Sequence, residues 1–554
     1  MHLGPTETLK YGHADHFSSP LNKKLLICVI ALAAWSFFLW RGIGVFRPGV
    51  PSLQYFHSDG AIPVLMATEA RPLTPFNLYY YGSDRWGGWP FLIAQAVTKV
   101  TGYRWSDISL STFQIIWIFV GALAIAALSR KDYAVIGAFF LLTLCLHGET
   151  RYQIFWLSEV YGWQLTAVLI GWYCLRKLIG NLSESDDWRP GRWLAWTALT
   201  FFFSYLAIWS SGTSILFLLF VATVELFRLR LQTGSVALTV RRWLKAAGPA
   251  FGAVIAAAVL ERAQRGVFYW YALRHYGSDF SASSHFRLDT GNLNHNLAAQ
   301  LGKLITLAWW PWELVAVIGL VAGLSVIVYA VAAKKRRNQT FEPLLSEDTF
   351  WLVVGASGIA LINFIVTVLI AHVRINQYED RYLTPTVILG PVSGLLVLYL
   401  ILKLCTRRTR VAQFVMPTVA ATAVVFLILK FPAPGNRHEY QTYKEIAAVL
   451  EQKSPRAILL GDYWGTYVFV ALQHTQPLTP VPLEGQMNRM PWTPAMVRQA
   501  SEVIVEYRRS KLAESGPPPA QLVQYGSTFR LVDPKMYEQS QFAFAKYVRE
   551  NPIP

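Results

Sequence analysis

Residues 312–333 read WELVAVIGLVAGLSVIVYAVAA, and four basic residues, Lys334 to Arg337, follow at once. The stretch carries one charged residue, Glu313, near its beginning. The hydrocarbon core of a bilayer is crossed by roughly 20 apolar residues in a helix. A cluster of Lys and Arg at the end of such a run is typical of the cytoplasmic side. The stretch therefore predicts a membrane-spanning helix that ends in the cytoplasm.

The same pattern recurs along the chain. The run at 25–43 follows a basic leader but has no small-residue cleavage site behind it, so we interpret it as an anchor. The runs at 133–147 and 247–260 are short for a span. We expect a polytopic α-helical membrane protein with about 11 spans, at 25–43, 113–129, 133–147, 159–175, 193–210, 212–228, 247–260, 312–333, 349–371, 386–404 and 412–430.

Composition supports this class. The 554 residues are 53% hydrophobic and only 15% charged, whereas soluble domains carry roughly 25% charged residues. The net charge of +17 would suggest nucleic acid in a soluble protein. Here Lys and Arg gather between apolar runs, so we expect no nucleic-acid partner. The four cysteines lie in or beside apolar runs, which indicates packing rather than a metal site or disulfides.

The basic clusters give an orientation. They fall in alternate loops, which places them all on one side, and the opposite loops are longer and less basic. The N-terminus is therefore expected in the cytoplasm and the C-terminus outside. The external segments are 44–112, 148–158, 261–303, 372–385 and 431–554, and we expect the protein to work on that side. The clusters are Lys23-Lys24, Arg130-Lys131, Arg176-Lys177, Arg241-Arg242, Lys334–Arg337 and Arg407-Arg408.

The tail predicts a second domain. Residues 1–430 form the transmembrane domain, and residues 431–554 are soluble in composition. Helices are expected at 440–452 and 463–473, and strands at 457–460, 501–507 and 527–532. The Ser515-Gly-Pro-Pro-Pro stretch marks a loop. We expect a compact, extracytoplasmic α/β domain packed over the outer loops.

The first external loop holds a candidate base. Asp59 precedes Gly60 and a run with apolar residues at helical spacing, so it lies where a helix would start. The simpler interpretation is an N-cap. The functional one is a general base at the membrane surface, and a capping carboxylate can still present a free oxygen. His57 and Glu69 are weaker companions in binding substrate.

Two arginines at the external border are candidate anion ligands. Arg85 lies among Trp and Gly residues, and Arg381 lies in a Glu-Asp-Arg-Tyr stretch directly before the tenth span. Arg381 could be neutralised by its acidic neighbours, or it could face a cavity and bind an anion. Arginine can meet a phosphate through two parallel hydrogen bonds. Tyr382 is a further candidate at the same place.

These features resemble the GT-C class of membrane glycosyltransferases, which includes protein O-mannosyltransferases and the lipid A aminoarabinose transferase. The similarity consists of an acidic residue after the first span, an Asp-Arg-Tyr-Leu-x-Pro stretch opening a late span, and the layout of loops and tail. The resemblance implies that Asp59 is the base and that Arg381 binds the donor phosphate. It also implies a bacterial inner membrane with the tail in the periplasm.

The resemblance further implies transfer of a sugar from a polyprenyl-phosphate donor to a saccharide, lipid or protein acceptor, with inversion. Two departures bear on this. Gly60 follows Asp59 where O-mannosyltransferases have Asp and Glu side by side, and residues 147–152 lack an Asp-x-Asp pair. We therefore expect no obligatory metal and no other cofactor. The sugar and the acceptor stay open.

Two other classes of function remain. A transporter or flippase of lipid-linked substrates would be expected to show inverted repeats and ionisable residues in mid-span. Neither is clear here, because the charges gather at the external border. A non-catalytic assembly protein whose tail binds a partner is the third possibility. The positions of Asp59 and Arg381 distinguish an enzyme from both, since an enzyme needs them in one cavity.

Overall fold

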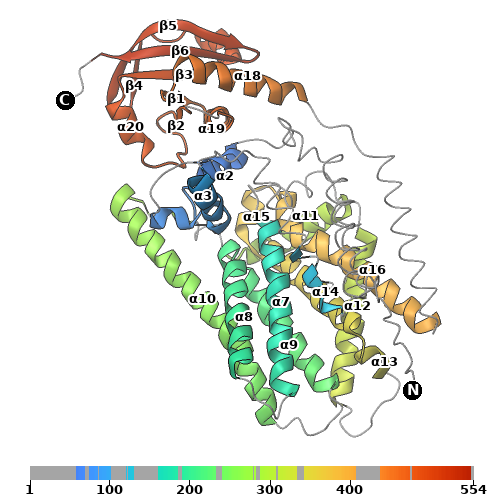
Figure 1. Ribbon diagram of the computed structural model, residues 1–554. Coiled ribbons are helices and arrows are strands. Elements are labelled where there is room, and N and C mark those ends of the chain that lie inside the picture. The colour runs from blue at the N-terminus through green and yellow to red at the C-terminus, as the bar shows by residue number, and fades with distance from the viewer. Residues whose placement is uncertain are drawn as a thin grey trace, which may run out of the picture.

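The computed structural model has two parts, a bundle of long helices and a sheet domain seated on one end of it (Figure 1). Its described residues hold mostly helices, followed by a C-terminal six-stranded sheet. The structure describes residues 58–68, 74–84, 86–101, 120–121, 123–125, 127–129, 160–184, 190–232, 240–278, 280–281, 287–306, 310–332, 342–406, 437–473 and 477–550.

The bundle consists of seven long helices within the described residues. Five of them hold segments long and apolar enough to cross a membrane: Gly191–Ser210, Trp243–Tyr276, Glu313–Val331, Asp348–Leu369 and Arg381–Ile401. The helices are α7 (Tyr161–Glu184), α8 (Pro190–Ser210), α9 (Ser214–Gln232), α10 (Val240–Tyr276), α12 (Trp310–Ala332), α14 (Asp348–Leu369) and α16 (Thr384–Thr406).

Most predicted spans that fall on described residues coincide with these helices. The runs at 159–175, 193–210, 212–228, 312–333, 349–371 and 386–404 correspond to α7, α8, α9, α12, α14 and α16. The runs at 25–43, 133–147 and 412–430 lie outside the described residues, and 113–129 does so in large part. The helical class of the fold is confirmed, while the total of about 11 spans stays a prediction.

The seventh predicted span is extended by its flanks, which its shortness in the sequence had left open. The sequence predicts a short helix at 247–260 followed by an external loop at 261–303, but α10 continues to Tyr276. A further helix, α11 (Leu293–Thr306), begins within the remainder of the predicted loop. The apolar run ends at Glu261 and Arg265, which are charged but pair with each other at 2.5 Å, so the helix passes through them.

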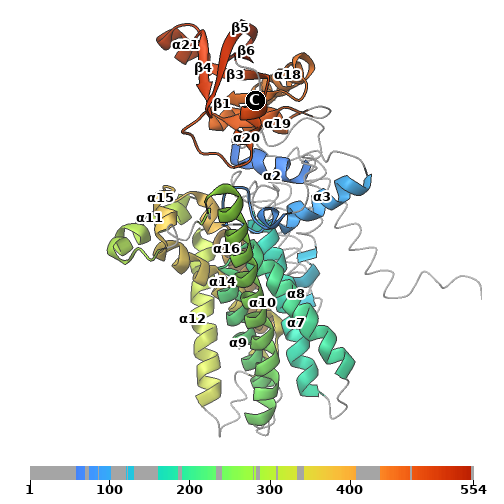
Figure 2. The ribbon, with the colours of Figure 1, turned by 90° about the vertical axis from the view of Figure 1, so that its left-hand side faces the viewer.

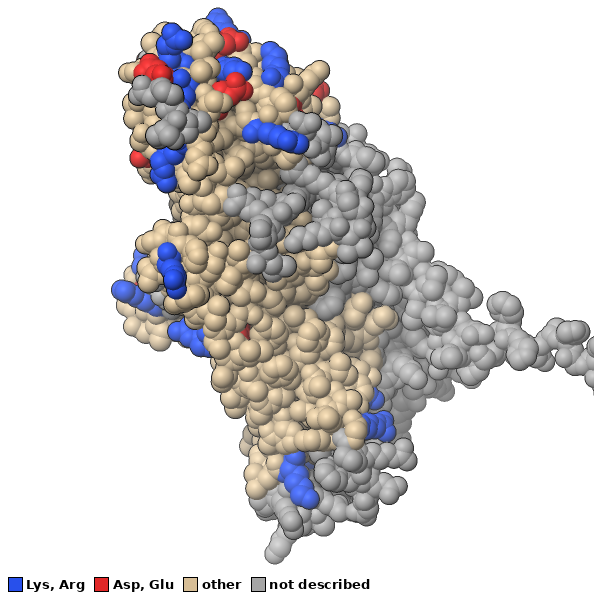
Figure 3. All heavy atoms as spheres, turned by 60° about the vertical axis from the view of Figure 1, so that its left-hand side comes forward, with Lys and Arg blue, Asp and Glu red and all other residues tan. Residues whose placement is uncertain are grey.

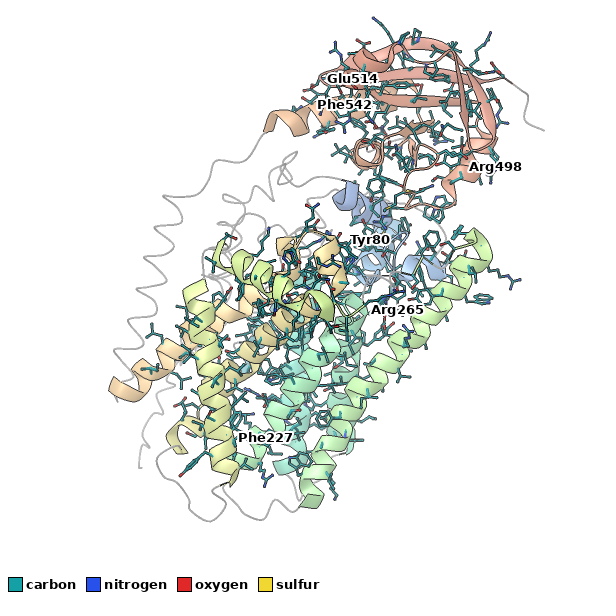
Figure 4. All side chains as sticks on the ribbon, turned by 180° about the vertical axis from the view of Figure 1, so that it is seen from behind. Tyr80, Phe227, Arg265, Arg498, Glu514 and Phe542 are labelled. Atoms are coloured by element: carbon teal, nitrogen blue, oxygen red, sulfur yellow. The ribbon has the colours of Figure 1, made fainter. Side chains whose placement is uncertain are left out.

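Charge is distributed along the bundle in bands. Figure 3 shows a broad surface without charge over the helices, with Lys and Arg at its lower end and again just below the sheet domain. Inside the bundle, Arg176 of α7 and Arg228 of α9 both pair with Glu225 and Asp348. Phe227, beside Arg228, lies at the end of the bundle remote from the sheet domain (Figure 4). The ends of α7 and α9 and the start of α14 therefore meet there.

The sheet domain follows an α/β order and then an antiparallel one. The strand order is β2-β1-β3-β6-β5-β4, with β1 parallel to β2 and β3 and the remaining pairs antiparallel. Its elements are α18 (Arg437–Lys453), β1 (Ile458–Gly461), α19 (Tyr463–Ala471), β2 (Thr479–Pro482), α20 (Thr493–Gln499), β3 (Glu502–Arg508), α21 (Arg509–Ser515), β4 (Gln521–Gln524), β5 (Ser527–Gln539) and β6 (Phe542–Arg549).

The two helices and three strands predicted in the tail are confirmed by α18, α19, β1, β3 and β5. The loop predicted after Ser515 is also present, since α21 ends there and Gly516 has a φ of 85°. The sequence analysis missed β2, β4 and β6, which complete the sheet. Residues on one face of this sheet, among them Val505 and Ala545, form a core of their own.

The segment predicted as the first external loop connects the two parts. Its helices are α2 (Ser58–Thr68), η2 (Pro75–Leu78) and α3 (Trp89–Thr101). Residues 61–67 of α2 are all buried, and α2 lies between the sheet domain and the bundle (Figure 1). From the sheet domain, Trp492 packs on Phe76 and Tyr81 of this loop, with ring centroids 5.9 and 5.0 Å away. The sheet domain thus rests on the first loop.

Candidate functional site

The site is built around Arg381, at the end of the bundle nearest the sheet domain. Arg381 lies in a short 3-10 helix, η5 (Asp380–Leu383), that leads directly into α16. Its guanidinium lies 5.9 Å from the ring centroid of Trp86 and 5.3 Å from that of Tyr382. Its Nε lies 2.5 Å from a carboxylate oxygen of Glu379. A charged group thus lies buried between two aromatic rings, with one acidic neighbour.

The backbone around Arg381 is fixed from α14. Asn363 of α14 donates hydrogen bonds to the carbonyl of Tyr382 at 3.0 Å and to the hydroxyl of Thr386 at 2.9 Å. Gln377 and Tyr378 take the left-handed conformation, with φ of 53° and 56°, and reverse the chain before η5. Such a conformation is uncommon outside glycine and indicates a locally determined turn.

The opposite wall of the site is a hairpin of the first loop, residues 79–87, which we call the aromatic hairpin. Tyr79 and Gly87 pair as an antiparallel bridge, and the amide of Tyr80 donates to the carbonyl of Trp86 at 3.0 Å. A side chain at Gly87 would collide with the carbonyl of Trp209, 2.2 Å from the added carbon. The hairpin can therefore approach α8 this closely only with glycine at this position.

The aromatic hairpin joins Arg381 to the sheet domain. The rings of Trp86 and Tyr80 meet at 5.1 Å, and the guanidinium of Arg489 lies 5.6 Å from the ring of Tyr80. Arg489 also donates to the carbonyl of Gly82 at 3.2 Å and to the hydroxyl of Tyr463 at 3.3 Å. Cation–aromatic contacts of this kind gain strength when they are removed from water. Two buried arginines thus flank a buried aromatic pair.

A second polar network holds the aromatic hairpin against α10. Arg265 donates to Asp84 at 2.9 Å and to Glu261 at 2.5 Å, and the hydroxyl of Tyr79 donates to Glu261 at 2.9 Å. Tyr269 also donates to Asp84. Burial raises the pKa of Tyr79 far above its ordinary value, and the negative charge of Glu261 acts in the same direction. Figure 4 shows Arg265 on α10 below Tyr80.

Sequence reasoning missed this network. Its signal was present in α10, because Glu261 and Arg265 are spaced for an ion pair on one helix face. The third member, Asp84, lies 181 residues from Arg265 along the chain, so only the fold brings it to the pair. The network has no free anion site of its own, since two carboxylates already share Arg265.

The structure describes some of the site residues that were predicted from the sequence and not others. Arg381 and Tyr382 lie together, and the ring of Tyr382 also contacts His372 at 5.7 Å. Arg85 lies outside the described residues, although its neighbour Trp86 contacts Arg381. His57 and Glu69 also lie outside them.

The candidate base Asp59 lies in the first turn of α2, which begins at Ser58. The N-cap prediction is therefore off by one or two residues, within the ordinary uncertainty of helix ends. The side chain of Asp59 lies outside the described part of the chain. Its role as the base and its distance from Arg381 both stay predictions.

No cluster of three or more His, Cys, Asp or Glu suited to a metal ion occurs among the residues that the structure describes. The positive charge of the Arg381 guanidinium favours an anion over a cation at this site. Independence from metal stays a prediction.

Comparisons with known proteins complete the description. No family model matches the chain, and no curated protein matches it in sequence. A solved structure of ArnT from Cupriavidus metallidurans bound to undecaprenyl phosphate is similar at 11% identity and a TM-score of 0.49, over 96% of this chain and 98% of that one.

The archaeal oligosaccharyltransferase AglB from Archaeoglobus fulgidus is also similar. In complex with an inhibitory peptide and a dolichol-phosphate, it matches at 12% identity and a TM-score of 0.44, over 88% of this chain and 70% of that one. In the apo form the TM-score is 0.46 at 12% identity, over 83% and 65% of the two chains. Similarity at this level assigns neither residue roles nor substrates to this chain.

Proposed function

We propose that this protein is a membrane glycosyltransferase that moves a sugar from a polyprenyl-phosphate donor to an acceptor hydroxyl outside the cytoplasm. One observation carries the proposal. Arg381 is a buried arginine at the external border of α16, stacked between Trp86 and Tyr382. A charged group at the border of a span is costly unless it serves a partner or a ligand, and the phosphate of a lipid-linked donor would lie at such a border.

The counter-ion of Arg381 fits a ligand-binding role. The side chain of Glu379 is 44% exposed, whereas that of Arg381 is only 9% exposed. Glu379 can therefore turn into solvent when a phosphate arrives, and Arg381 keeps a partner at both stages. The planar guanidinium, held between two rings, is already oriented for two parallel hydrogen bonds to phosphate oxygens. Arg85, the neighbour of Trp86 in the sequence, is the second cation that we propose.

The proposed reaction is a single displacement. The acceptor oxygen attacks the anomeric carbon, its proton passes to the carboxylate of Asp59, and the bond from the anomeric carbon to the phosphate oxygen breaks. The polyprenyl phosphate leaves with one more negative charge, which Arg381 stabilises. One general base suffices for such a step, and a single displacement inverts the anomeric centre.

The place of α2 supports this assignment. Asp59 lies at the N-terminal end of α2, and α2 lies between the sheet domain and the bundle. An acceptor that approaches from outside the membrane would meet this helix end. The donor would come from the lipid side, toward α16. The two substrates would thus meet near the aromatic hairpin, which contacts both Arg381 and the sheet domain.

The experiment is turnover by the purified protein in lipid nanodiscs, with a panel of polyprenyl-phosphate sugars and a mixture of acceptors. A transferase releases free polyprenyl phosphate and forms a new glycosidic bond of inverted configuration, which mass spectrometry and NMR detect. In sealed vesicles, a flippase would instead move the intact donor between leaflets. Donor movement without any release of polyprenyl phosphate across the panel would contradict the proposal.

A further inference from the structure

Helix α11 (Leu293–Thr306) buries polar side chains and exposes aliphatic ones, which is the reverse of a helix on the surface of a soluble protein. Its buried face carries Asn296 and Gln300, which are 1% and 0% exposed. Its outward face carries aliphatic side chains at every fourth position. A helix in water buries its apolar stripe and exposes its polar one. The outward residues are Leu293, Leu297, Leu301 and Ile305, which are 41%, 40%, 44% and 58% exposed.

The polar face is used to hold neighbouring elements. Asn296 donates to the carbonyl of Val368, at the end of α14, at 3.0 Å and to Asp289 at 3.3 Å. It accepts a hydrogen bond from the hydroxyl of Tyr378 at 2.7 Å. Tyr378 belongs to the turn that precedes Arg381. Asn296 is therefore fixed by contacts with α14 and this turn, which leaves the apolar stripe on the outward side of the helix.

Helix α11 lies beside the ends of the long helices. Leu304 packs with Phe364 of α14 and with Leu383 and Val387 at the start of α16. In Figure 2, α11 and α15 (Ala371–Ile375) project sideways from the bundle at the outer ends of the long helices. Helix α11 therefore lies at the level where the candidate spans end.

The apolar stripe continues the surface of the next span. Helix α12 begins at Trp310, shortly after α11 ends. Most of its exposed residues are apolar, with Ser325 the polar exception, and only 22% of the span Glu313–Val331 is buried. The large exposed hydrophobic residues of α12 are Leu314, Val317, Ile318, Val321, Leu324, Val328 and Tyr329. The same surface that meets lipid along α12 thus runs onto α11.

We infer that α11 lies in the membrane interface, with its apolar stripe inserted into the external leaflet at the boundary between headgroups and acyl chains. An amphipathic helix of this kind lies in the plane of the interface. Leu288, 70% exposed just before the helix, and the adjacent exposed Arg287 extend the surface with one apolar and one cationic side chain. The cation can meet lipid phosphates. The inference does not depend on the chemistry at Arg381.

Insertion of α11 has a geometric consequence. Leu304 on its inner side contacts the cluster that includes Leu383, two residues beyond Arg381. The depth of α11 in the leaflet therefore sets the depth of η5 and of its arginine. A lipid-anchored helix is in this way connected to the buried cation through a few aliphatic contacts.

The test places an environment-sensitive fluorophore on single cysteines of the full chain, in a parent whose Cys28, Cys145, Cys174 and Cys405 are replaced by Ala. Leu297→Cys and Leu301→Cys report on the stripe. Val317→Cys on α12 is the lipid control, at 40% exposure. Val523→Cys on β4 is the matched solvent control, because it is also apolar and 59% exposed. The labelled proteins are reconstituted in nanodiscs with lipids spin-labelled near the headgroup or deep in the chain.

We expect strong quenching at Leu297→Cys and Leu301→Cys by the shallow spin label, weaker quenching by the deep label, and none at Val523→Cys. Val317→Cys should favour a deeper label. Equal, low quenching at Leu297→Cys and Val523→Cys would overturn the inference, as would a cross-link between Leu297→Cys residues of two copies. Because two separate positions report, failure of one variant to fold leaves the other to decide.

Discussion

Buried arginines occur at both ends of the helical bundle, and the exposure of their partners differs. At the end remote from the sheet domain, Arg176 and Arg228 share Glu225 and Asp348, whose side chains are 1% and 5% exposed. All four groups are closed off from solvent. Removing one partner of such a network leaves an uncompensated charge in a medium of low dielectric. This cluster therefore acts as a structural clamp between three helices.

At the outer end, Arg381 is just as buried but its partner Glu379 is 44% exposed. An exposed partner can be replaced by another anion at small cost, because an ion pair at the surface contributes little free energy. Burial of an arginine alone therefore does not indicate a binding role. If Arg381 binds phosphate as proposed, the accessibility of its counter-ion is what distinguishes this end of the bundle from the clamp.

The largest effect is expected at Asp59. If Asp59 is the base, Asp59→Asn removes the proton acceptor, and turnover should fall by about 10² to 10⁴. If it only supports the start of α2, the change should be nearly harmless, because Asn serves a helix start about as well as Asp. Turnover with the correct donor decides, with elution as a monodisperse peak as the folding control. Activity within a few-fold of the parent would remove Asp59 from the mechanism.

Replacing Glu225 of the clamp should lower the stability of the protein. Glu225→Ala leaves Arg176 and Arg228 short of one buried partner, and we expect a loss of roughly 3–5 kcal/mol in unfolding free energy. The measurement is the apparent unfolding midpoint in detergent at one fixed heating rate. Glu379→Ala is the matched control and should cost less than Glu225→Ala, because the lost carboxylate is 44% exposed and water can replace it. Equal midpoints for the two variants would break the distinction between clamp and ligand site.

Arg381 should control donor binding. Arg381→Ala removes charge-assisted hydrogen bonds of about 1.5–3 kcal/mol, which corresponds to donor affinity weakened by roughly ten- to a hundredfold. Arg381→Lys should restore only part of the lost donor affinity, because the ammonium group lacks the planar fork of the guanidinium. Arg374→Ala, in the same loop and paired with Asp289 at 2.6 Å, is the control. If Arg381→Ala bound donor as tightly as Arg374→Ala, the phosphate assignment would be wrong.

The sheet domain contains a buried carboxyl group that should make the stability of the folded protein depend on pH. Burial raises the pKa of Glu506 to about 8, and Gly465 and Gly461 leave no space between its carboxyl and their backbones. The folded state therefore binds a proton that the unfolded state has released, so stability falls as pH rises from about 4.5 to about 8. Each tenfold difference in proton affinity corresponds to roughly 1.4 kcal/mol.

Glu506→Gln removes this dependence. The variant should be more stable than the parent above about pH 8, and this advantage should vanish at acidic pH, where the parent carboxyl is protonated. Unfolding midpoints of both proteins across the pH range give the test. Glu502→Gln on the same strand, where Glu502 pairs with Lys546 at 2.8 Å, is the control. A pH-independent difference between Glu506→Gln and the parent would contradict the account.

The sequence predicted those parts of the fold that depend on continuous apolar runs. The spans near α12, α14 and α16 follow from composition alone, because a bilayer selects for length and hydrophobicity. The far end of α10 could not be predicted in this way. Glu261 and Arg265 interrupt its apolar run, and Asp84, which completes their network, comes from a distant loop.

The candidate site, like the fold, could be predicted from the sequence only in part. Arg381 stood out because a basic residue at the border of a span needs a reason. Its contact with Trp86 and the contact of Tyr80 with Arg489 join segments that are hundreds of residues apart, and no periodicity in the sequence indicates them. Of the two interpretations of Arg381 left open by the sequence, the structure shows the ion pair with an acidic neighbour, while anion binding stays a prediction.

The smallest expected effect is also the most direct test of the comparison between the two ends. Glu379 competes with the donor phosphate for Arg381 if the exposed counter-ion is exchangeable. Glu379→Gln keeps the size and polarity of the side chain but removes its charge, so the phosphate no longer has to displace a carboxylate. A half-exposed ion pair of this kind is worth up to about 1 kcal/mol, which limits the gain in donor affinity to roughly fivefold.

The measurement is donor affinity of Glu379→Gln and of the parent in nanodiscs at several salt concentrations. Salt weakens the Arg381–Glu379 pair and should narrow the difference between the two proteins. Asp289→Asn, which removes the partner of Arg374 in the neighbouring pair, is the control and should leave donor affinity unchanged. Weaker donor binding in Glu379→Gln would mean that the carboxylate positions Arg381 for its ligand. The outer pair would then be a clamp like the inner one, and exposure of the counter-ion would no longer distinguish them.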